Sequence, residues 1–412
     1  MSRKDKVVVI GGGFGGLFTA LELVDKADVT LISKDDQFTF TPMLYEYLSG
    51  EVEAWHVSPY YKDLIDNKML FVRGEVTDVD FDNKKVIIEG WGKTFDYDSL
   101  VIAVGSTSNY YGIKGAAQHT IPFRKASHAD ELRRRMITAL DAIPPETSPE
   151  EVRDKLTFAI VGGGASGVEL ATKMADMLRD AVKRRNLKGE ARVIIFEMGE
   201  RIVPGMGDEL HKIVDESLNK EKVTVSTTTK VVEVKAHSIV HEHDGETVET
   251  PTAAVIWTAG IRVSALNEKL NVEKNDKNLI ILEPTLQVKG RPEVFALGDN
   301  ATLENVPSKL PGTAQLAFQE SSFVANNVKA FLAGKKLKNG EFKELGETVS
   351  LGTENAAIGV GNFAYGGALA REARFAIYTS RLPTWHHRLK VGADWFLGGT
   401  KPQPLQTGDF NL

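Results

Sequence analysis

Short apolar runs and longer amphipathic stretches follow one another along this chain. The first run, Val7–Ile10, is β-branched and ends in a glycine cluster, after which helix-forming residues extend from about Phe14 to Lys26. A second apolar run follows at Val29–Ile32, and the order of run, glycines and helix returns from Leu156 onward. Strand, tight turn and helix in this order begin a βαβ unit, so the pattern predicts an α/β fold with a repeated architecture.

Both glycine clusters have the spacing GxGxxG. In the first, Gly11 and Gly13 remove Cβ atoms that would keep a pyrophosphate away from the backbone, and Gly16 lets the helix pack closely on the strand. The unpaired N–H groups of the helix N-terminus then bind the phosphates. One such cluster could be an ordinary turn, but two in one chain favour dinucleotide sites; the second comprises Gly162, Gly164 and Gly167.

The residue that follows the second strand of each unit distinguishes the two sites. A carboxylate there usually binds the ribose hydroxyls of the dinucleotide. Glu197 fits this role and predicts NADH rather than NADPH, although Arg201 lies close enough to weaken that preference. In the first unit the position is Ser33, which can make one hydrogen bond, or Asp35 could reach back to the ribose.

Small residues end two further buried runs. Ala103 and Gly105 end the run that begins at about residue 97, and Ala259 and Gly260 end a related run near residue 255. Such residues allow a close approach of backbone, either for structural reasons or beside a cofactor. Because each run trails a glycine cluster, we expect both pairs to lie beside a bound nucleotide.

A last strand end, at Gly298 and Asp299, predicts the domain organisation. Gly298 permits a close approach, and Asp299 would accept a hydrogen bond from a ribityl hydroxyl of FAD. An FAD unit that resumes after an NADH unit predicts two Rossmann-like domains, with the NADH domain inserted in the FAD domain. We expect FAD-binding segments at 1–115 and 271–330, an NADH-binding domain at 116–270, and a membrane-association or interface region at 331–412.

Composition and net charge exclude several classes of partner and of catalytic chemistry. The 412 residues are 42% hydrophobic and 26% charged, as in a folded protein of two or three domains, and the run Arg133–Arg135 is typical of a solvated helix face. A net charge of -6 gives no reason to expect nucleic acid, and no apolar run reaches the roughly eighteen residues of a membrane span. The lack of cysteine excludes disulfide and thiolate chemistry, iron–sulfur clusters and Cys–zinc sites, so no metal ligand is named. No secretory leader is expected before the first strand.

The segment Phe38–Glu51 carries a resemblance to a known family. Pro42 suits the first turn of a helix with Thr41 as its cap. The segment resembles the one that lies over the flavin ring in type II NADH dehydrogenases, single-chain flavoproteins that reduce quinones. The similarity extends over almost the whole chain. Pro42–Glu51 and Arg381–Phe396 resemble the plant-plastid and cyanobacterial branch that is related to demethylphylloquinone reductases.

The resemblance assigns the acceptor side of the site. Gln315 and Gln319 are four residues apart on a helix expected from Pro311, and as a lone pair they would be ordinary surface residues. Their motif resembles the family's quinone site, which implies that they line the pocket against the flavin and hydrogen-bond a quinone carbonyl. Glu169, in isolation also a typical surface residue, matches the family's acid near the nicotinamide and quinone. We name these three residues as catalytic, with Glu169 handling a proton or ordering water.

The C-terminal segment Arg371–Lys401 is basic and rich in aromatic residues. Six Lys or Arg residues against Glu372 and Asp394 leave an excess of about four positive charges, with Trp, Phe and Leu between them. This pattern fits attachment to an anionic membrane surface, whereas a helix packed on the core or in a dimer interface is the alternative. We expect a peripheral protein on the cytoplasmic side of the cell membrane, and the resemblance implies a homodimer.

These features predict a single-subunit, non-proton-pumping NADH:quinone oxidoreductase with non-covalent FAD. NADH would pass a hydride to the flavin, and a membrane quinone, a naphthoquinone or similar, would take two electrons and two protons. One alternative is a soluble NAD(P)H-dependent ferredoxin- or rubredoxin-type reductase. Another is an NADH-responsive flavoprotein in signalling.

Overall fold

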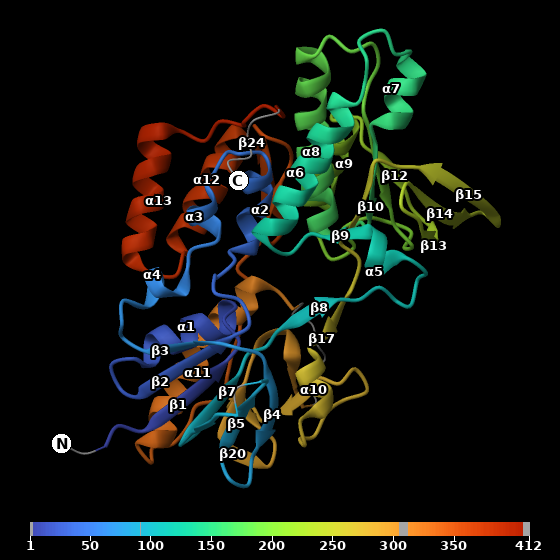
Figure 1. The fold of residues 1–412 in the computed structure, drawn as a ribbon. Coiled ribbons are helices and arrows are strands. Elements are labelled where there is room, and N and C mark those ends of the chain that lie inside the picture. The colour runs from blue at the N-terminus through green and yellow to red at the C-terminus, as the bar shows by residue number, and fades with distance from the viewer. Residues whose placement is uncertain (1–2, 91, 305–311, 407–412) are drawn as a thin grey trace.

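The largest sheet occupies the lower half of the computed structural model, which describes residues 3–90, 92–304 and 312–406 (Figure 1). Its strand order is β21-β18-β19-β20-β7-β1-β2-β3. The central strand β1 pairs in parallel with β2 and β7, which places Val7 opposite Val29 and Ser99. The strands are β1 (Lys6–Ile10), β2 (Asp28–Ser33), β3 (Leu70–Arg73), β7 (Ser99–Ile102), β18 (Ile280–Leu282), β19 (Gln287–Val288), β20 (Arg291–Ala296) and β21 (Ala301–Leu303).

A second sheet of five parallel strands lies in the upper right of Figure 1, in the order β12-β11-β10-β16-β9. Every residue of β10 and of β16 is buried. Strands covered by helices on both faces read as continuous apolar runs, which explains the pattern of the sequence here. The strands are β9 (Thr120–Pro122), β10 (Thr157–Val161), β11 (Arg192–Phe196), β12 (Thr224–Ser226) and β16 (Ala254–Trp257).

Two short strands connect the large sheets. The chain leaves the first sheet through β8 (Ser106–Ser108) and returns to it through β17 (Ile261–Val263). These strands pair antiparallel, with Ile261 opposite Ser108. The second sheet is therefore inserted in the chain that builds the first. Two smaller antiparallel sheets comprise β4 (Val76–Asp80), β5 (Lys85–Ile88) and β6 (Thr94–Asp96), and β13 (Lys230–Val234), β14 (Ser238–His243) and β15 (Glu246–Pro251).

Helices cover both sheets and bury their apolar faces. On the first sheet, α1 (Phe14–Leu23) packs against α11 (Ala314–Leu332), where the rings of Phe18 and Phe318 meet edge to face at 4.9 Å. The longest helix, α8 (Ala165–Arg184), lies on the second sheet with α6 (Ala126–Asp141) beside it (Figure 1). The remaining helices before residue 305 are η1 (Thr41–Met43), α2 (Leu44–Leu48), α3 (Ala54–Val57), α4 (Tyr61–Ile65), α5 (Ala116–His119), α7 (Pro149–Lys155), α9 (Asp208–Lys220), α10 (Ala265–Lys269) and η2 (Gly298–Asn300).

The C-terminal part folds back over the junction between the two sheets (Figure 1). It comprises an antiparallel sheet of β22 (Glu347–Ser350), β23 (Ala356–Val360) and β24 (Phe363–Gly367), followed by α12 (Ala368–Ser380) and α13 (Trp385–Gly398). The two helices pack through Phe375 and Trp395, whose rings are 4.9 Å apart. No helix among residues 3–406 that the structure describes is long and apolar enough to span a membrane.

The predicted α/β architecture with two Rossmann-like sheets is confirmed, although β19 pairs antiparallel with both of its neighbours in the first sheet, and two local expectations are wrong. Thr41 does not cap a helix: it is the first residue of the 3₁₀ turn η1, which Phe40 precedes without a side-chain cap. Arg133 does not lie on a solvated face. Its guanidinium is buried and donates hydrogen bonds to the carbonyls of Leu48 and Pro404, at 3.1 and 2.8 Å, because the C-terminal tail crosses α6 at this point.

Candidate dinucleotide and electron-acceptor site

The three glycines of the first cluster have different roles. A Cβ on Gly11 would lie 2.2 Å from the carbonyl oxygen of Ala103, and a Cβ on Gly16 would lie 1.8 Å from that of Gly11. Both glycines therefore allow strands and helix to pack. Gly13 differs, because a Cβ there would meet no described atom within 4 Å. Gly13 is the N-cap of α1, so the open space lies at the positive end of that helix.

The second cluster repeats this arrangement residue for residue. A Cβ on Gly162 would lie 2.8 Å from the backbone nitrogen of Ala259, and a Cβ on Gly167 would lie 2.0 Å from the carbonyl oxygen of Gly162. Gly164, the N-cap of α8, again faces space free of described atoms within 4 Å. Each helix N-terminus thus presents a cradle, the open space beside its glycine turn, and both cradles fit a dinucleotide pyrophosphate. That Gly11 also makes room for a pyrophosphate stays a prediction; the contact that the structure shows for a Cβ on Gly11 is with Ala103.

Ser33, the last residue of β2, and Glu197, the residue after β11, also occupy equivalent places. Glu197 accepts hydrogen bonds from the backbone N–H of Gly163 at 2.6 Å and of Gly199 at 2.7 Å, so its carboxylate is held against the glycine turn. Ser33 lies at the matching position, where its hydroxyl oxygen would be 3.0 Å from a Cβ on Gly12. The hydroxyl of Tyr61 donates to the carbonyl of Gly12 at 2.7 Å and takes up part of the volume that a glutamate would fill.

Asp299 lies in a polar cluster at the end of β20. The hydroxyl of Ser106 donates to Asp299 at 2.6 Å, and the guanidinium of Arg124 donates to the carbonyl of Ser106 at 3.0 Å. Burial lowers the pKa of Arg124, while the negative charge of Asp299 opposes this effect. Gly105 is tied to the same turn, because its N–H donates to the side chain of Asn300 at 3.2 Å. Arg124 has no motif around it, and the sequence analysis missed it.

Glu320 adds a second carboxyl to this region. It accepts a hydrogen bond from the N–H of Gly298 at 2.7 Å, and Gly298 has a φ of +75°. Burial, reinforced by the charge of Asp299, raises the pKa of Glu320 to about 7. No salt bridge reaches Glu320 from any part of the chain that the structure describes. On the other side of the β8–β17 ribbon, Gly260 has a φ of +67°, and the hydroxyl of Tyr111 packs over it.

Glu169 lies where the two sheets meet the C-terminal helices. It is on the second turn of α8 and accepts hydrogen bonds from the N–H of Ser350 at 2.8 Å and from Arg374 of α12 at 3.0 Å. The same guanidinium donates to the carbonyl of Pro42 at 2.8 Å and to the carboxylate of Glu46. Glu169 is therefore a buried acid next to the Thr41–Pro42 turn, and not a surface residue.

The two carboxyls that share Arg374 have opposite electrostatics. Burial raises the pKa of Glu169 to about 7, although Arg374 and the N–H of Ser350 oppose this rise. Burial also acts against the Glu46 anion, but Arg374 and Lys173 outweigh it, so the pKa of Glu46 is lowered. The two carboxyls therefore differ in acidity, because the pKa of Glu46 lies below its ordinary value and that of Glu169 lies above it.

Gln315 and Gln319 face the segment that leads to Glu169. The amide of Gln315 donates to the carbonyl of Gly346 at 3.2 Å and accepts from the N–H of Leu345 at 3.2 Å. The amide of Gln319 donates to the carbonyl of Lys343 at 2.8 Å and accepts from its N–H at 3.2 Å. Each NH₂ group keeps its second hydrogen. Five residues after Leu345 the same segment reaches Ser350, so one stretch of chain joins both glutamines to Glu169.

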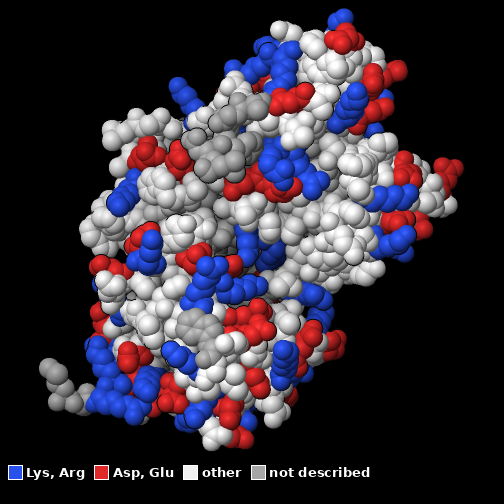
Figure 2. All heavy atoms as spheres, in the orientation of Figure 1, with Lys and Arg blue, Asp and Glu red and all other residues white. Residues whose placement is uncertain are grey.

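The C-terminal segment carries fewer outward charges than the sequence suggested. Arg371 and Arg374 turn inward to pair with Glu51 and Glu46. Over the visible face of the molecule, Lys and Arg are interspersed with Asp and Glu (Figure 2). Large apolar side chains are exposed instead: within the segment they are Trp385, Leu389, Phe396 and Leu397, and before it Leu345, Val360, Phe363, Tyr365 and Leu369.

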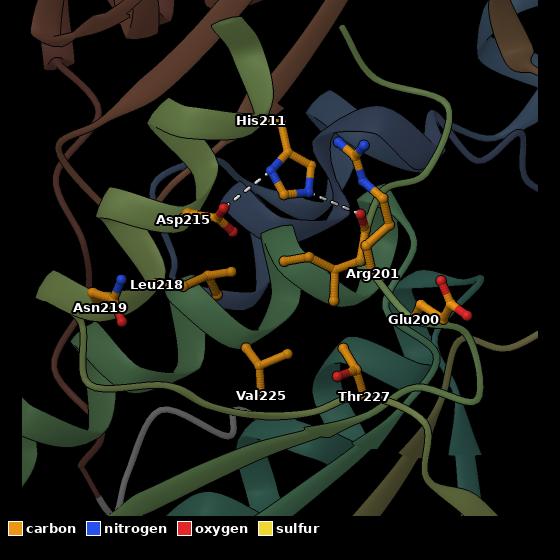
Figure 3. A pocket seen from close by; sticks show the side chains of 9 residues that line it. Glu200, Arg201, His211, Asp215, Leu218, Asn219, Val225 and Thr227 are labelled. Carbon is orange, nitrogen blue, oxygen red and sulfur yellow. Dashed lines mark hydrogen bonds and ion pairs between the residues drawn. The ribbon is translucent and has the colours of Figure 1, made fainter. Parts of the chain in front are cut away.

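A cavity of about 340 Å³ lies beyond the Glu197 loop, between α9 and β12 (Figure 3). His211 spans it, with Nδ1 3.0 Å from Asp215 and Nε2 3.2 Å from the carbonyl oxygen of Ile202. Arg201 lines the opening and lies 3.9 Å from Asp208. Ile202, which lines the cavity, also lies next to the glycine turn of the second sheet, 2.7 Å from a Cβ on Gly163.

Comparison with known proteins identifies this arrangement. Residues 5–321 match the family of pyridine nucleotide-disulphide oxidoreductases. The demethylphylloquinone reductase NdbB of Synechocystis is 32% identical, over 95% of this chain and 96% of the relative. The type II NADH:quinone oxidoreductase Ndh of Mycobacterium tuberculosis is 30% identical, over 89% of this chain and 82% of the relative.

The chain belongs to the pyridine nucleotide-disulphide oxidoreductases. Among them it groups with the type II NADH:quinone oxidoreductases, and FAD and NADH are its cofactors. The structure of NDH2 from Plasmodium falciparum in complex with RYL-552 shares the fold, with a TM-score of 0.85 at 21% identity over 98% of this chain and 100% of that chain. Since this family member has no cysteine, the disulphide chemistry in the family's name is absent from it.

Proposed function

We propose that this chain oxidises NADH and reduces a quinone through one FAD. The observation that carries the proposal is the pair of equivalent glycine cradles in a cysteine-free chain, with the buried acid Glu169 at the junction between them. FAD, when bound, would supply the hydride acceptor for NADH and the two-electron donor for the quinone. With one proton from the medium, the overall reaction converts NADH and quinone into NAD⁺ and quinol.

On the NADH side, the N-terminus of α8 would receive the pyrophosphate next to Gly164. Glu197 is already oriented by two backbone N–H groups, so its carboxylate would accept from the ribose hydroxyls and repel a 2′-phosphate. Gly162 and Gly167 shape this turn from behind, together with Ala259 and Gly260.

On the FAD side, the N-terminus of α1 would receive the pyrophosphate next to Gly13. Asp299, oriented by Ser106, would accept from the ribityl chain, and the Thr41–Pro42 turn would cover the ring. Ser33 would bind the adenosine ribose in place of the usual acid. Gly11 and Gly16, with Ala103, Gly105 and Gly298, would hold the surrounding backbone in place.

On the quinone side, Gln315 and Gln319 would use the amide hydrogens that the 343–346 segment leaves available. Glu169 would supply a proton to the reduced quinone oxygen, because burial keeps its carboxyl protonated up to about neutral pH. A naphthoquinone or similar quinone suits this role.

The molecule would reach its quinone as a peripheral membrane protein on the cytoplasmic side and as a homodimer. The exposed apolar side chains of β23, β24, α12 and α13 support this part of the proposal more strongly than basic charge does. The domain limits would be 1–115 and 271–330 for FAD, 116–270 for NADH, and 331–412 for the membrane or interface region.

The test separates the two half-reactions. Anaerobic NADH should bleach the flavin absorbance of the purified protein, and a soluble naphthoquinone should restore it promptly. Gln319→Leu should slow the second step at least tenfold and leave the first unchanged, while the exposed Gln118→Leu on α5 serves as the matched control. Bleaching without recovery would refute the quinone reading and indicate a protein acceptor.

A further inference from the structure

Arg374 is a single guanidinium that serves two carboxylates. Its side chain, that of Glu46 and that of Glu169 are 3%, 5% and 9% exposed. One terminal nitrogen of Arg374 bonds to Glu46, and the other bonds to Glu169 at 3.0 Å and to the carbonyl of Pro42 at 2.8 Å. Its ring neighbour is Tyr378, with the guanidinium carbon 4.7 Å from the ring centroid. Three elements from distant parts of the chain thus meet at one cation.

The charges of this cluster do not balance when both acids are ionised. Arg374 contributes one positive charge, whereas Glu46 and Glu169 would contribute two negative charges. The adjacent cluster is balanced, since Glu51 pairs with Lys173 at 2.5 Å and with Arg371 at 2.8 Å, and Arg371 also pairs with Glu372 at 2.6 Å. Buried charge without a partner is costly, so one carboxyl next to Arg374 tends to hold a proton.

We propose that Glu46 and Arg374 are positioning residues that make Glu169, and not Glu46, the carboxyl of this cluster that exchanges a proton. This inference rests on the proposed role of Glu169 in quinone reduction and explains how the fold selects that residue. Glu46 lies directly against the guanidinium, so Arg374 stabilises the anion of Glu46 more strongly than that of Glu169. The anion of Glu169 is stabilised by the second terminal nitrogen of Arg374 and by the N–H of Ser350.

The pKa directions agree with this geometry. The pKa of Glu46 is lowered, that of Glu169 is raised to about 7, and that of Arg374 is raised, so the guanidinium stays charged. Burial raises the pKa of the tyrosines nearby, which stay neutral. The titratable groups that face Glu169 are Arg374 and Tyr378 of α12 and Tyr45 and Glu46 of α2; one turn along α8 follow Lys173 and its partners Glu51 and Arg371.

The proton step is balanced in each turnover. The Glu169 carboxyl loses its proton to the quinone oxygen, and the resulting carboxylate is held by Arg374 and by the N–H of Ser350. A proton from the medium then restores the acid. Glu46 stays ionised throughout, so the local charge changes by one unit only.

The experiment titrates the buried acid in the FAD-loaded protein. Difference infrared spectroscopy would follow the carboxylic acid C=O band with pH, and Glu169→Gln would assign the band by removing it. In the unmodified protein the midpoint should lie near pH 7. In Glu46→Gln, which keeps the shape and removes the charge, Arg374 becomes free for Glu169, so the midpoint should fall by about one to three pH units.

The rate of flavin reoxidation by a soluble naphthoquinone should follow the same titration. Its decline with rising pH should move to lower pH in Glu46→Gln, whereas the bleaching by NADH should not change. Glu46→Asp keeps the charge and should keep the midpoint, and the exposed Glu209→Gln on α9 controls for a remote loss of charge. If Glu46→Gln does not fold, Arg374→Lys supplies the second test, because a point charge that cannot bond both acids should raise the midpoint of Glu169.

Two results would overturn the inference. One is a C=O band that disappears in Glu46→Gln and persists in Glu169→Gln, because this result would show that Glu46 is the carboxyl that holds the proton. The other is a Glu169 midpoint that is unchanged in Glu46→Gln. By contrast, normal quinone reduction in Glu169→Gln would refute the proposed catalytic role of Glu169, and the infrared titration would still decide whether Glu46 and Arg374 set its protonation.

Discussion

Alanine at two neighbouring glycines should separate FAD binding from folding. Gly13 and Gly16 belong to the same turn and helix, yet a Cβ on Gly13 would meet no described atom within 4 Å, and one on Gly16 would lie 1.8 Å from a backbone oxygen. Gly13→Ala should therefore give a stable protein that loses FAD. Gly16→Ala should give a protein that is less stable before any cofactor is considered.

The magnitudes follow from the local geometry. Gly13 has a φ of -72° and a ψ of -166°, which alanine adopts without strain, so the free energy of unfolding should change by less than about 1 kcal/mol. At Gly16 the backbone must move apart, which costs about 1–3 kcal/mol or more, and the better helix propensity of alanine returns about 1 kcal/mol at most. FAD should bind Gly13→Ala at least tenfold more weakly.

Urea unfolding of flavin-free protein and FAD titration by fluorescence measure these two quantities. Gly164→Ala and Gly167→Ala provide the matched pair at the second turn, where FAD should be retained and the KM for NADH should rise in Gly164→Ala. The reasoning is refuted if Gly13→Ala loses as much stability as Gly16→Ala, or if it binds FAD like the unmodified protein.

Three further substitutions test other parts of the structure. Lys173→Met should destabilise the fold by about 3 kcal/mol in urea, since among the described residues Glu51 keeps Arg371 as its one cationic partner, beside the hydroxyl of Ser49; a change below 1 kcal/mol would contradict this. Glu197→Ser should raise the KM for NADH and reduce the preference over NADPH in steady-state assays, and an unchanged preference would remove Glu197 from the ribose site. Glu320→Gln should flatten the stability of flavin-free protein against pH. The folded-state pKa of Glu320, about 7, lies above its ordinary value, so the stability it gives at low pH is lost as pH rises from about 4.5 to 7; an identical profile in the variant would contradict this.

The fold could be predicted because its signals are local. Each parallel strand is a short apolar run, and Gly16 and Gly167 must be glycine for contacts with Gly11 and Gly162 of their own turns. Gly11 and Gly162 could therefore be placed from spacing alone. The contact that requires glycine at Gly11 could not be predicted in this way, because the atom that excludes a Cβ there belongs to Ala103, some ninety positions later.

The acid cluster could not be predicted from the residues around each member. Glu46, Glu169 and Arg374 lie in three separate stretches, and nothing in their own neighbourhoods shows that they meet. Arg374 was counted as part of a basic surface because its partners are distant in sequence. Arg133 was misplaced for the same reason, since the tail that buries it comes from residues 403–404.

The antiparallel ribbon of β8 and β17 has a consequence for how such proteins can be assembled. The chain enters and leaves the inserted unit at two points that are hydrogen-bonded neighbours, with Ser106 opposite Val263. Adjacent ends are the condition under which a whole domain can be spliced into a surface loop of a host without stretching it. A gene segment that encodes this unit could thus be exchanged for another nucleotide-binding module, which would change the electron donor, provided that the module keeps the acid that Glu169 supplies from α8.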